Sequence, residues 1–300
     1  MPKISVILPI FNPNMTFLDQ ALHSVQNQSV EDFECLCVCD SPSADLNAYL
    51  LNLSKRDKRF RMVRGNNSGL IDALNLGIDN AKGAYIARMD SDDICMPLRF
   101  EKQCALLDSG KYDVVGGHYF IIDNKDSFLS SRVVPVKPEH IAITLCLTVP
   151  FAHSSVMLRK SFLREKNLRY GQGNSKIAED YQLWTQMFNN EARFGNVDDW
   201  ILKYRWSENS LSQIVQASNK KDTIKIQDEF VKENSNFLQK VIASIFNQNV
   251  NSEMGEALCF LSWKLLFRSF NIINFIKNLK KVNKRSVATG TLKFFMGRFS

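Results

Sequence analysis

Short apolar runs alternate with segments of helical periodicity in the N-terminal part of the chain. The runs at 4–10, 33–39, 60–63 and 84–89 are typical of buried strands. Segments 16–28, 46–53 and 70–81 carry apolar residues at helical spacing. Alternation of strand and helix with short connections predicts an α/β fold with a parallel sheet covered by helices on both faces.

The pattern changes after residue 94. It predicts a helix over 97–107, a strand over 114–122, an apolar segment over 149–158 and a helix over 177–188. Segment 207–218 is polar and predicts a loop. From residue 220 onward the chain has helical periodicity and no strand signal. We therefore expect a helical extension after a mostly parallel sheet.

Composition agrees with a globular protein, because 45% of the residues are hydrophobic and 23% are charged. The net charge of +7 is unevenly distributed. Nine basic residues and no acid fall in 257–300, so the rest of the chain carries 7 − 9 = −2. This argues against a nucleic-acid partner and for an anionic surface that meets one end of the chain.

The basic segment 257–300 also carries interleaved aromatic residues, such as Phe260, Trp263 and Phe267. This composition is typical of an amphipathic helix that lies on an anionic membrane. A helix packed on the rest of the protein with a solvated basic face is the alternative. No apolar run is long enough to span a membrane, and Met1 lies just before the first strand, so we expect a cytoplasmic protein, peripheral on the inner face of the membrane.

Three of the seven cysteines, Cys35, Cys37 and Cys39, alternate within one predicted strand. They would point to the same face of the sheet. Three thiolates on one strand cannot easily converge on one tetrahedral ion. We expect buried, free cysteines in a reducing compartment.

An acidic cluster, Asp90-Ser91-Asp92-Asp93, directly follows the predicted strand 84–89. Such close like charges raise one another's pKa or require a cation. A divalent ion with oxygen ligands is the natural partner and would bring a diphosphate with it. A helix N-cap with an acid in the first turn could explain one or two of the aspartates, but not three at a strand end.

Several segments in fixed order carry a resemblance to a known family. They are Ser5–Asn12, Asn66–Leu70, Ala81–Asp93, Pro97–Gln103 and Ala178–Trp184. Together they resemble the family 2 inverting glycosyltransferases with a GT-A fold. The resemblance covers about two thirds of the chain. It implies a Rossmann-like catalytic domain over 1–215, with a nucleotide-binding half (1–93) and an acceptor half (94–215), and a helical basic region over 216–300 that would associate with a membrane.

The resemblance assigns the acidic cluster to a Mn²⁺ or Mg²⁺ ion and to the donor diphosphate. It implies that Asp92 is a direct metal ligand and that Asp90 contacts the ion, a metal-bound water or the nucleotide. Asp93 would support the ligands or cap the next helix. The ion would offset the charge that develops on the leaving phosphate.

The nucleobase pocket is expected at the ends of the first two strands, where Pro9, Phe11, Asn12 and Asp40 lie. The resemblance implies that Asp40 reads the base, and a carboxylate can accept a hydrogen bond from a uracil N–H. A turn residue before a proline is the other interpretation of Asp40. The family's first aspartate at this place is replaced by Cys39. Two further residues, Asn67 and Arg88, complete the expected nucleotide site.

The segment Glu179-Asp180 precedes an apolar helix face. Inverting transfer needs a base that removes a proton from the acceptor hydroxyl. The resemblance makes Asp180 that base, with Glu179 orienting it or contacting the acceptor; ordinary acids of a helix first turn are the alternative. Trp184 would present an apolar face to a sugar ring, although burial in the core is more common for such a residue.

Two further residues are candidates for sugar or phosphate contacts. His153 lies where many relatives carry a histidine, although a lone histidine is more often structural. Arg205 would supply positive charge to the diphosphate, because Ser207 replaces a histidine that many relatives have.

The expected function is metal-dependent inverting transfer of a sugar from a nucleotide donor, UDP by preference, to a hydroxyl of a glycan or lipid-linked glycan. A sugar nucleotidyltransferase is one alternative, but it would carry a glycine-rich loop after the first strand, and segment 8–12 has no glycine. A catalytically inactive relative that binds a nucleotide sugar or a membrane is the other.

Overall fold

The computed structural model of the protein describes residues 1–172, 178–207, 216–245 and 261. These residues form two compact units. The first consists of 1–136 and 151–219, and the second of 137–150 and 220–300. The sequence analysis assigned 137–150 to the first domain, whereas in the structure its helix α5 (Pro138–Leu145) groups with α9 (Gln216–Glu233) and α10 (Ser235–Ile245).

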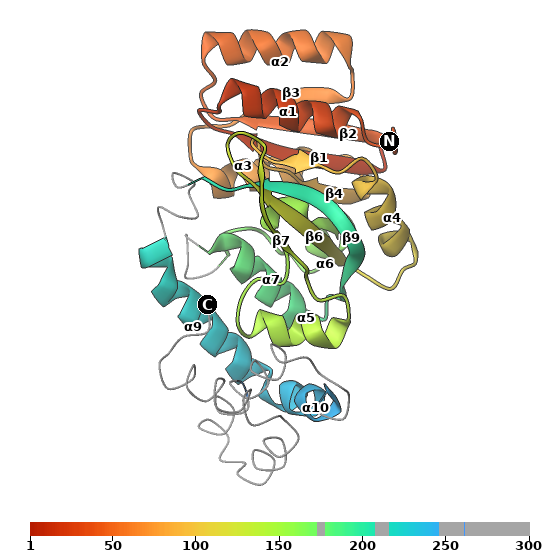
Figure 1. Ribbon diagram of the computed structural model, residues 1–300, viewed down its shortest axis with the longest axis vertical. Helices are drawn as coiled ribbons and strands as arrows, with labels where there is room; N and C mark the ends of the chain where they lie inside the picture. Colours follow the sequence, from red (N-terminus) through yellow and green to blue (C-terminus); the bar gives the residue numbers. More distant parts are fainter. Residues whose placement is uncertain (173–177, 208–215, 246–260, 262–300) are drawn as a thin grey trace. The chain divides into compact units, whose positions relative to one another are not determined.

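The first unit is built on a sheet that contains nine strands in the described part of the chain (Figure 1). Its order is β3-β2-β1-β4-β8-β6-β9-β5, and β7 pairs with β6. The strands of the first half are β1 (Ile4–Ile10), β2 (Phe33–Cys39), β3 (Phe60–Arg64) and β4 (Tyr85–Arg88). The others are β5 (Ile94–Cys95), β6 (Val114–Ile122), β7 (Phe128–Arg132), β8 (Met157–Arg159) and β9 (Phe194–Arg205).

Strands β1 to β4 are parallel, and β6 is parallel to β9. Strand β8 is antiparallel to both β4 and β6. Because β8 runs opposite to both β4 and β6, these two strands point in the same direction. Strands β4, β6 and β9 therefore end at the same edge of the sheet as β1 and β2. This edge, which we call the carboxyl edge, brings together the loops that follow β1, β2 and β4 and the last residues of β6 and β9.

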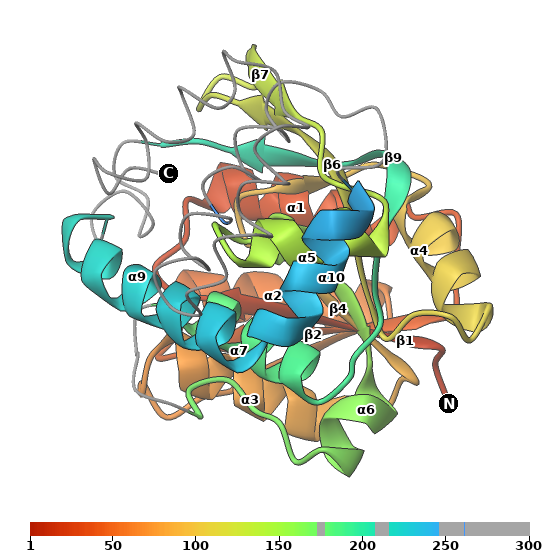
Figure 2. The same ribbon diagram turned by 90° about the horizontal axis from the view of Figure 1, so that it is seen from below.

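Helices cover both faces of the sheet (Figure 2). One face packs against α1 (Met15–Gln26), α2 (Ala44–Arg56) and α4 (Arg99–Asp108). Helices α3 (Leu70–Asn80) and α6 (Lys160–Glu165) lie on the opposite side from α1 and α4. Every residue of β2 is buried, as expected for a strand covered on both faces. Cys35, Cys37 and Cys39 lie in the core as free thiols, which confirms that expectation.

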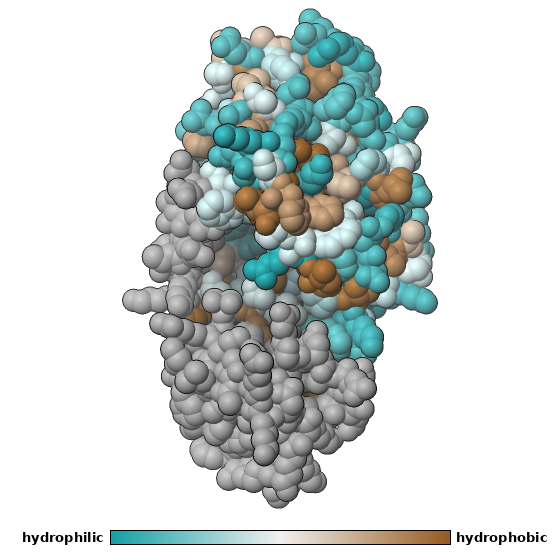
Figure 3. All heavy atoms as spheres, viewed as in Figure 1, coloured by the Kyte–Doolittle hydropathy of each residue, from teal (hydrophilic) through white to brown (hydrophobic). Residues whose placement is uncertain are grey.

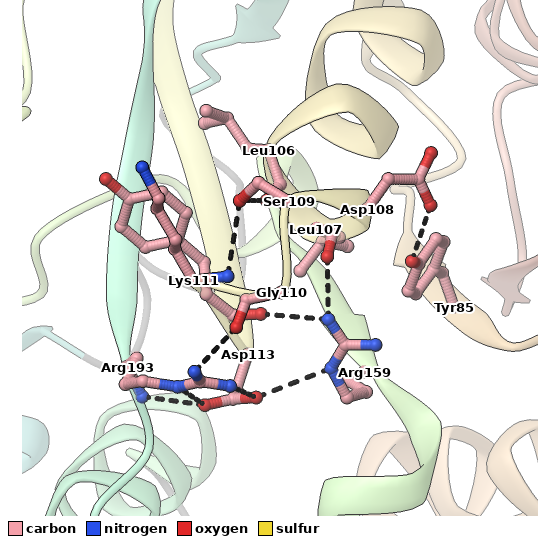
Figure 4. Close-up of polar contacts among 11 residues, drawn as sticks. Tyr85, Leu106, Leu107, Asp108, Ser109, Gly110, Lys111, Asp113, Arg159 and Arg193 are labelled. Atoms are coloured by element: carbon pink, nitrogen blue, oxygen red, sulfur yellow. Dashed lines mark hydrogen bonds and ion pairs between the residues drawn. The ribbon is translucent and has the colours of Figure 1, made fainter.

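The opposite edge of the sheet is closed by ion pairs (Figure 4). The buried Asp113 carboxylate accepts hydrogen bonds from Arg193 Nε at 2.8 Å and Nη2 at 2.9 Å, and Arg159 Nε lies 3.4 Å from it. Tyr85 Oη donates to Asp108 at 2.7 Å on the same edge. These contacts hold the starts of β4, β6 and β9 together and leave the carboxyl edge for ligands.

The β7 hairpin is an exposed part of the first unit. All five residues of β7 are exposed, and apolar side chains lie along its course (Figure 3). Phe128, Leu129 and Val133 are the exposed large apolar residues of this segment. The periodicity of the sequence did not predict β7, because neither face of this strand is buried.

Candidate active site

The acidic cluster lies at the carboxyl edge, directly after β4. Oxygen atoms of Asp90, Asp92 and Asp93 lie within 4.8 Å of one another. The first two side chains are partly exposed, whereas Asp93 is buried. Burial and the charge of Asp90 raise the pKa of Asp92 to about 6. The cluster is therefore a concentration of negative charge, and a divalent ion would relieve the repulsion within it.

Asp93 is held by the protein through both of its carboxylate oxygens. One accepts a hydrogen bond from Ser154 Oγ and the other from the Arg205 backbone N–H at 2.7 Å. Ser154 belongs to a short 3-10 turn, η1 (His153–Ser155), and Arg205 is the last residue of β9. Asp93 thus connects the cluster to two later segments of the chain. It does not cap a helix, because strand β5 begins at the next residue, Ile94.

Arg88 is the buried cation of the site. It is 4% exposed and forms an ion pair with Asp90. Within the described residues its Nε donates no hydrogen bond. The charge of Arg88 also lowers the pKa of Glu179 and Asp180. A buried guanidinium so close to the acidic cluster supplies positive charge beside a bound phosphate.

Glu179 and Asp180, which we call the acid pair, are the first two residues of helix α7 (Glu179–Asn189). Burial and then the neighbouring Asp180 raise the pKa of Glu179 to about 7. Burial also raises the pKa of Asp180, whose Oδ1 accepts a hydrogen bond from the Tyr181 N–H at 2.7 Å. The charge of Asp90 contributes to both shifts. The turn η1 connects this pair to the acidic cluster, because Ser154 donates to Asp93 and the ring of His153 lies 6.0 Å from that of Trp184, one turn after Asp180 in α7.

Comparison with known proteins identifies the family. Residues 5–166, more than half of the chain, match the model of glycosyl transferase family 2. This protein belongs to that family. It is therefore a glycosyltransferase, which decides against the sugar nucleotidyltransferase that the sequence alone left open.

Individual relatives agree with the family. The glycosyltransferase is 28% identical over 242 residues to an uncharacterized glycosyltransferase of Haemophilus influenzae, which covers 76% of this chain and 73% of the relative. It is 29% identical over 210 residues to the O-antigen biosynthesis glycosyltransferase WbnJ of Escherichia coli, with 68% and 80% covered.

Solved structures share the fold. TarS of Staphylococcus aureus (residues 1–349, in complex with UDP-GlcNAc) aligns with a TM-score of 0.57 at 17% identity, covering 99% of this chain and 93% of that chain. The α/β sheet of this glycosyltransferase, largely parallel and flanked by helices, therefore has the GT-A architecture that the resemblance implied. No described helix is long and apolar enough to cross a membrane.

The residues that the sequence predicts to contact the base lie at the ends of β1 and β2. The Asp40 N–H donates to Ile10 O at 3.4 Å, so Pro9, Phe11 and Asn12 lie beside Asp40. The Phe11 ring is exposed. These residues form one surface, as the parallel pairing of β1 and β2 requires.

Asp40 also organises the loop that precedes α3. Its carboxylate accepts hydrogen bonds from Asn67 N at 3.2 Å and Gly69 N at 3.3 Å. Gly65 has no space for a Cβ atom, because Asp40 Oδ1 would lie 1.8 Å from it. Asn67 and Gly69 both have positive φ angles, 58° and 93°. The loop is therefore shaped around Asp40.

Trp184 and Arg205 do not have the roles that the sequence suggested for them. Trp184 is fully buried and packs edge-on against Phe151 at 5.3 Å, so it has no face to offer to a sugar. The Arg205 guanidinium is buried over the Phe17 ring. It donates to Asp92 O and Gln20 Oε1, both at 2.8 Å, and lies 2.7 Å from Asp126. It supports the acidic cluster from inside the protein and leaves no charge for a phosphate.

His153 lies between the acidic cluster and helix α7. Its ring packs against Trp184 and is partly buried, and its Nε2 lies 2.9 Å from Tyr170 Oη. Burial and the charge of Arg88 lower its pKa well below the ordinary value, so the ring is neutral. The sequence analysis named His153 but did not single out Ser154 or Tyr170. Ser154 adjoins a named residue, whereas no sequence signal marked Tyr170.

Proposed function

We propose that this glycosyltransferase transfers a sugar from a UDP-linked donor to a hydroxyl of a glycan or lipid-linked glycan, with inversion at the anomeric carbon and with a divalent metal ion. The observation that carries the proposal is the proximity of the acid pair to the acidic cluster. Ser154 of η1 donates to Asp93, and the neighbouring His153 packs against Trp184 on the helix that Glu179 and Asp180 begin. A single displacement needs a base and a stabilised leaving group on one sugar, and this arrangement supplies both.

The leaving-group half consists of the acidic cluster and Arg88. Asp92 and Asp90 have the carboxylate oxygens that Mn²⁺ or Mg²⁺ prefers, and both are partly exposed. Asp93 has both oxygens bound by the protein, so it orients the cluster. The ion would neutralise charge on the leaving diphosphate. Arg88, which is paired with Asp90, would add its positive charge to that of the ion.

The acceptor half consists of the acid pair. Asp180 would accept the proton of the acceptor hydroxyl as that oxygen attacks the anomeric carbon. Its burial supports this role, because a carboxylate with a raised pKa is the stronger base. Glu179 would orient Asp180 or contact the acceptor. No enzyme nucleophile is needed, because one displacement inverts the anomeric centre once.

The nucleotide would bind to the surface at the ends of β1 and β2. Pro9, Phe11 and Asn12 would contact the base and ribose, and Asp40 would accept a uracil N–H. Asn67, held by Asp40, completes this pocket. TarS structures in complex with UDP-GlcNAc and UDP support a uridine donor, and the O-antigen relative WbnJ supports a glycan acceptor.

The membrane hypothesis concerns 257–300, which lies outside the described residues apart from Leu261. We propose that residues 1–215 form the catalytic domain and that 216–300 hold it on an anionic membrane. Nine basic residues without an acid support this. Vesicles that contain anionic lipid should bind the full chain, whereas neutral vesicles should not. Equal binding to both would contradict the proposal.

A donor screen tests the proposed reaction. UDP-sugars would be incubated with the protein and Mn²⁺ or Mg²⁺, and nucleotide release measured with and without EDTA. Asp180→Asn should lower kcat about 100-fold or more, which is the usual contribution of a general base. Asp45→Asn is the matched control, because Asp45 is exposed on α2. Turnover in EDTA would refute metal dependence, and near-normal kcat of Asp180→Asn would refute the base assignment.

A further inference from the structure

Tyr170 contacts His153, which lies between the acidic cluster and the acid pair. It is 5% exposed, and its hydroxyl lies 2.9 Å from His153 Nε2. Its backbone is fixed by Asn75 of α3 through two hydrogen bonds. Asn75 Nδ2 donates to Tyr170 O at 3.0 Å, and the Tyr170 N–H donates to Asn75 Oδ1 at 3.1 Å. Backbone and hydroxyl are thus held by separate segments, which gives the side chain a defined position.

The partner of the Tyr170 hydroxyl, His153, connects it to both parts of the site. Ser154, the next residue, donates a hydrogen bond to Asp93 of the acidic cluster. On the other side the His153 ring lies 6.0 Å from the ring of Trp184, one turn after Asp180 in α7. In the proposed reaction, the sugar being transferred has to lie between these two parts. The Tyr170 hydroxyl is therefore placed where that sugar passes.

The hydrogen bond between His153 and Tyr170 can form in two directions. Burial raises the pKa of Tyr170 far above physiological pH, so the hydroxyl keeps its proton. Neutral His153 either donates its Nε2 hydrogen to Tyr170 Oη or accepts the hydroxyl hydrogen. Only donation from His153 leaves the Tyr170 O–H free to donate to a ligand.

We propose that Tyr170 is a sugar-binding residue of this enzyme, which donates a hydrogen bond from its hydroxyl to an oxygen of the sugar being transferred. His153 and Asn75 act through Tyr170 as positioning residues. His153 orients the hydroxyl, and Asn75 fixes the backbone. This inference rests on the proposed function. It also gives His153 a role beside the site, since this residue acts on the substrate through the tyrosine.

Tyr170→Phe tests the proposal because it removes only the hydroxyl group. The matched control is Tyr85→Phe. Tyr85 is also 5% exposed and also loses one side-chain hydrogen bond, to Asp108, but it lies at the opposite edge of the sheet (Figure 4). Both variants would be compared with the wild type for the midpoint of urea unfolding, for kcat and for calorimetric binding of two ligands. The ligands are UDP alone and the UDP-sugar that the donor screen selects.

The two ligands separate sugar binding from a structural role. Tyr170→Phe should weaken binding of the UDP-sugar or lower kcat about tenfold or more, and leave the affinity for UDP unchanged, because UDP lacks the sugar. Tyr85→Phe should change neither. Equal loss of UDP and UDP-sugar affinity, or no loss of either affinity or kcat, would overturn the inference. Absence of wild-type turnover with every UDP-sugar would instead overturn the proposed function and this inference with it.

A double-mutant cycle tests the role of His153 even where one variant folds poorly. His153→Gln keeps an N–H donor for the Tyr170 oxygen, whereas His153→Leu does not. We expect His153→Gln to retain several-fold more activity than His153→Leu in the wild-type background. In the Tyr170→Phe background the two should be equal, because His153 acts through the hydroxyl. The same several-fold difference in both backgrounds would refute the coupling.

Discussion

The raised pKa of Glu179 predicts a pH-dependent gain in stability on replacing this residue with glutamine. Burial first, and then the charge of Asp180, raise the pKa of Glu179 from 4.5 to about 7. Because the folded pKa lies above the unfolded one, the stability that the protonated carboxyl brings is fully present below pH 4.5. It is lost as the pH rises through 7. The gap between the two pKa values, at about 1.4 kcal/mol for each pH unit, corresponds to about 3 kcal/mol.

Glu179→Gln removes this pH dependence, because glutamine is neutral at every pH. The metal-free variant should therefore match the wild type near pH 4.5 and exceed its free energy of unfolding by about 3 kcal/mol at pH 8. Urea unfolding in EDTA, followed by tryptophan fluorescence from pH 4.5 to 8, measures the difference. Comparing the two proteins at each pH cancels the contribution of the carboxylates that do not interact with Glu179.

An exposed glutamate supplies the control. Glu165→Gln on α6 should change the free energy of unfolding by less than about 0.5 kcal/mol at every pH, since this residue is exposed. A difference between Glu179→Gln and wild type that is constant with pH, or that grows toward acid, would refute the reasoning. It would mean that the Glu179 carboxylate is solvated or neutralised in the folded protein.

Three further variants probe the support of the site. Ser154→Ala removes the hydroxyl that donates to Asp93, so the affinity for Mn²⁺, measured by calorimetry, should fall about tenfold; unchanged affinity would show that the contact does not orient the cluster. Arg99→Met removes a fully buried guanidinium that donates to Arg88 O at 2.7 Å and to Gln103 Oε1 at 3.0 Å. Because both acceptors remain buried, urea unfolding should show a loss of about 2–4 kcal/mol, and a loss below about 0.5 kcal/mol would contradict this. Asp40→Ala removes the acceptor of the Asn67 and Gly69 N–H groups, so UDP affinity should fall about tenfold while the affinity for Mn²⁺ is kept; parallel loss of both would indicate a general disturbance of the sheet edge.

The sequence by itself determined the first half of the sheet and the position of the acidic cluster. Strands β1, β2 and β6 begin and end at the predicted residues, because each is a continuous apolar run bounded by polar residues. Alternation of these strands with helices then requires parallel pairing and places the loops after them at one edge. The family also followed from motifs in fixed order. These features are local or follow from connection rules, so periodicity and spacing are enough to find them.

Only the tertiary structure decided what surrounds the cluster. Strand β9 was not predicted, because its residues alternate irregularly and pair with β6 through two register shifts. Its last residue, Arg205, therefore reaches the cluster from the inside instead of facing a ligand. Trp184 could equally have been exposed or buried until packing against Phe151 was known. Tyr170 shows no periodicity or motif, and its position depends on bonds to His153 and Asn75 that join distant segments. Such roles are set by long-range contacts, which a residue's neighbours in the sequence do not encode.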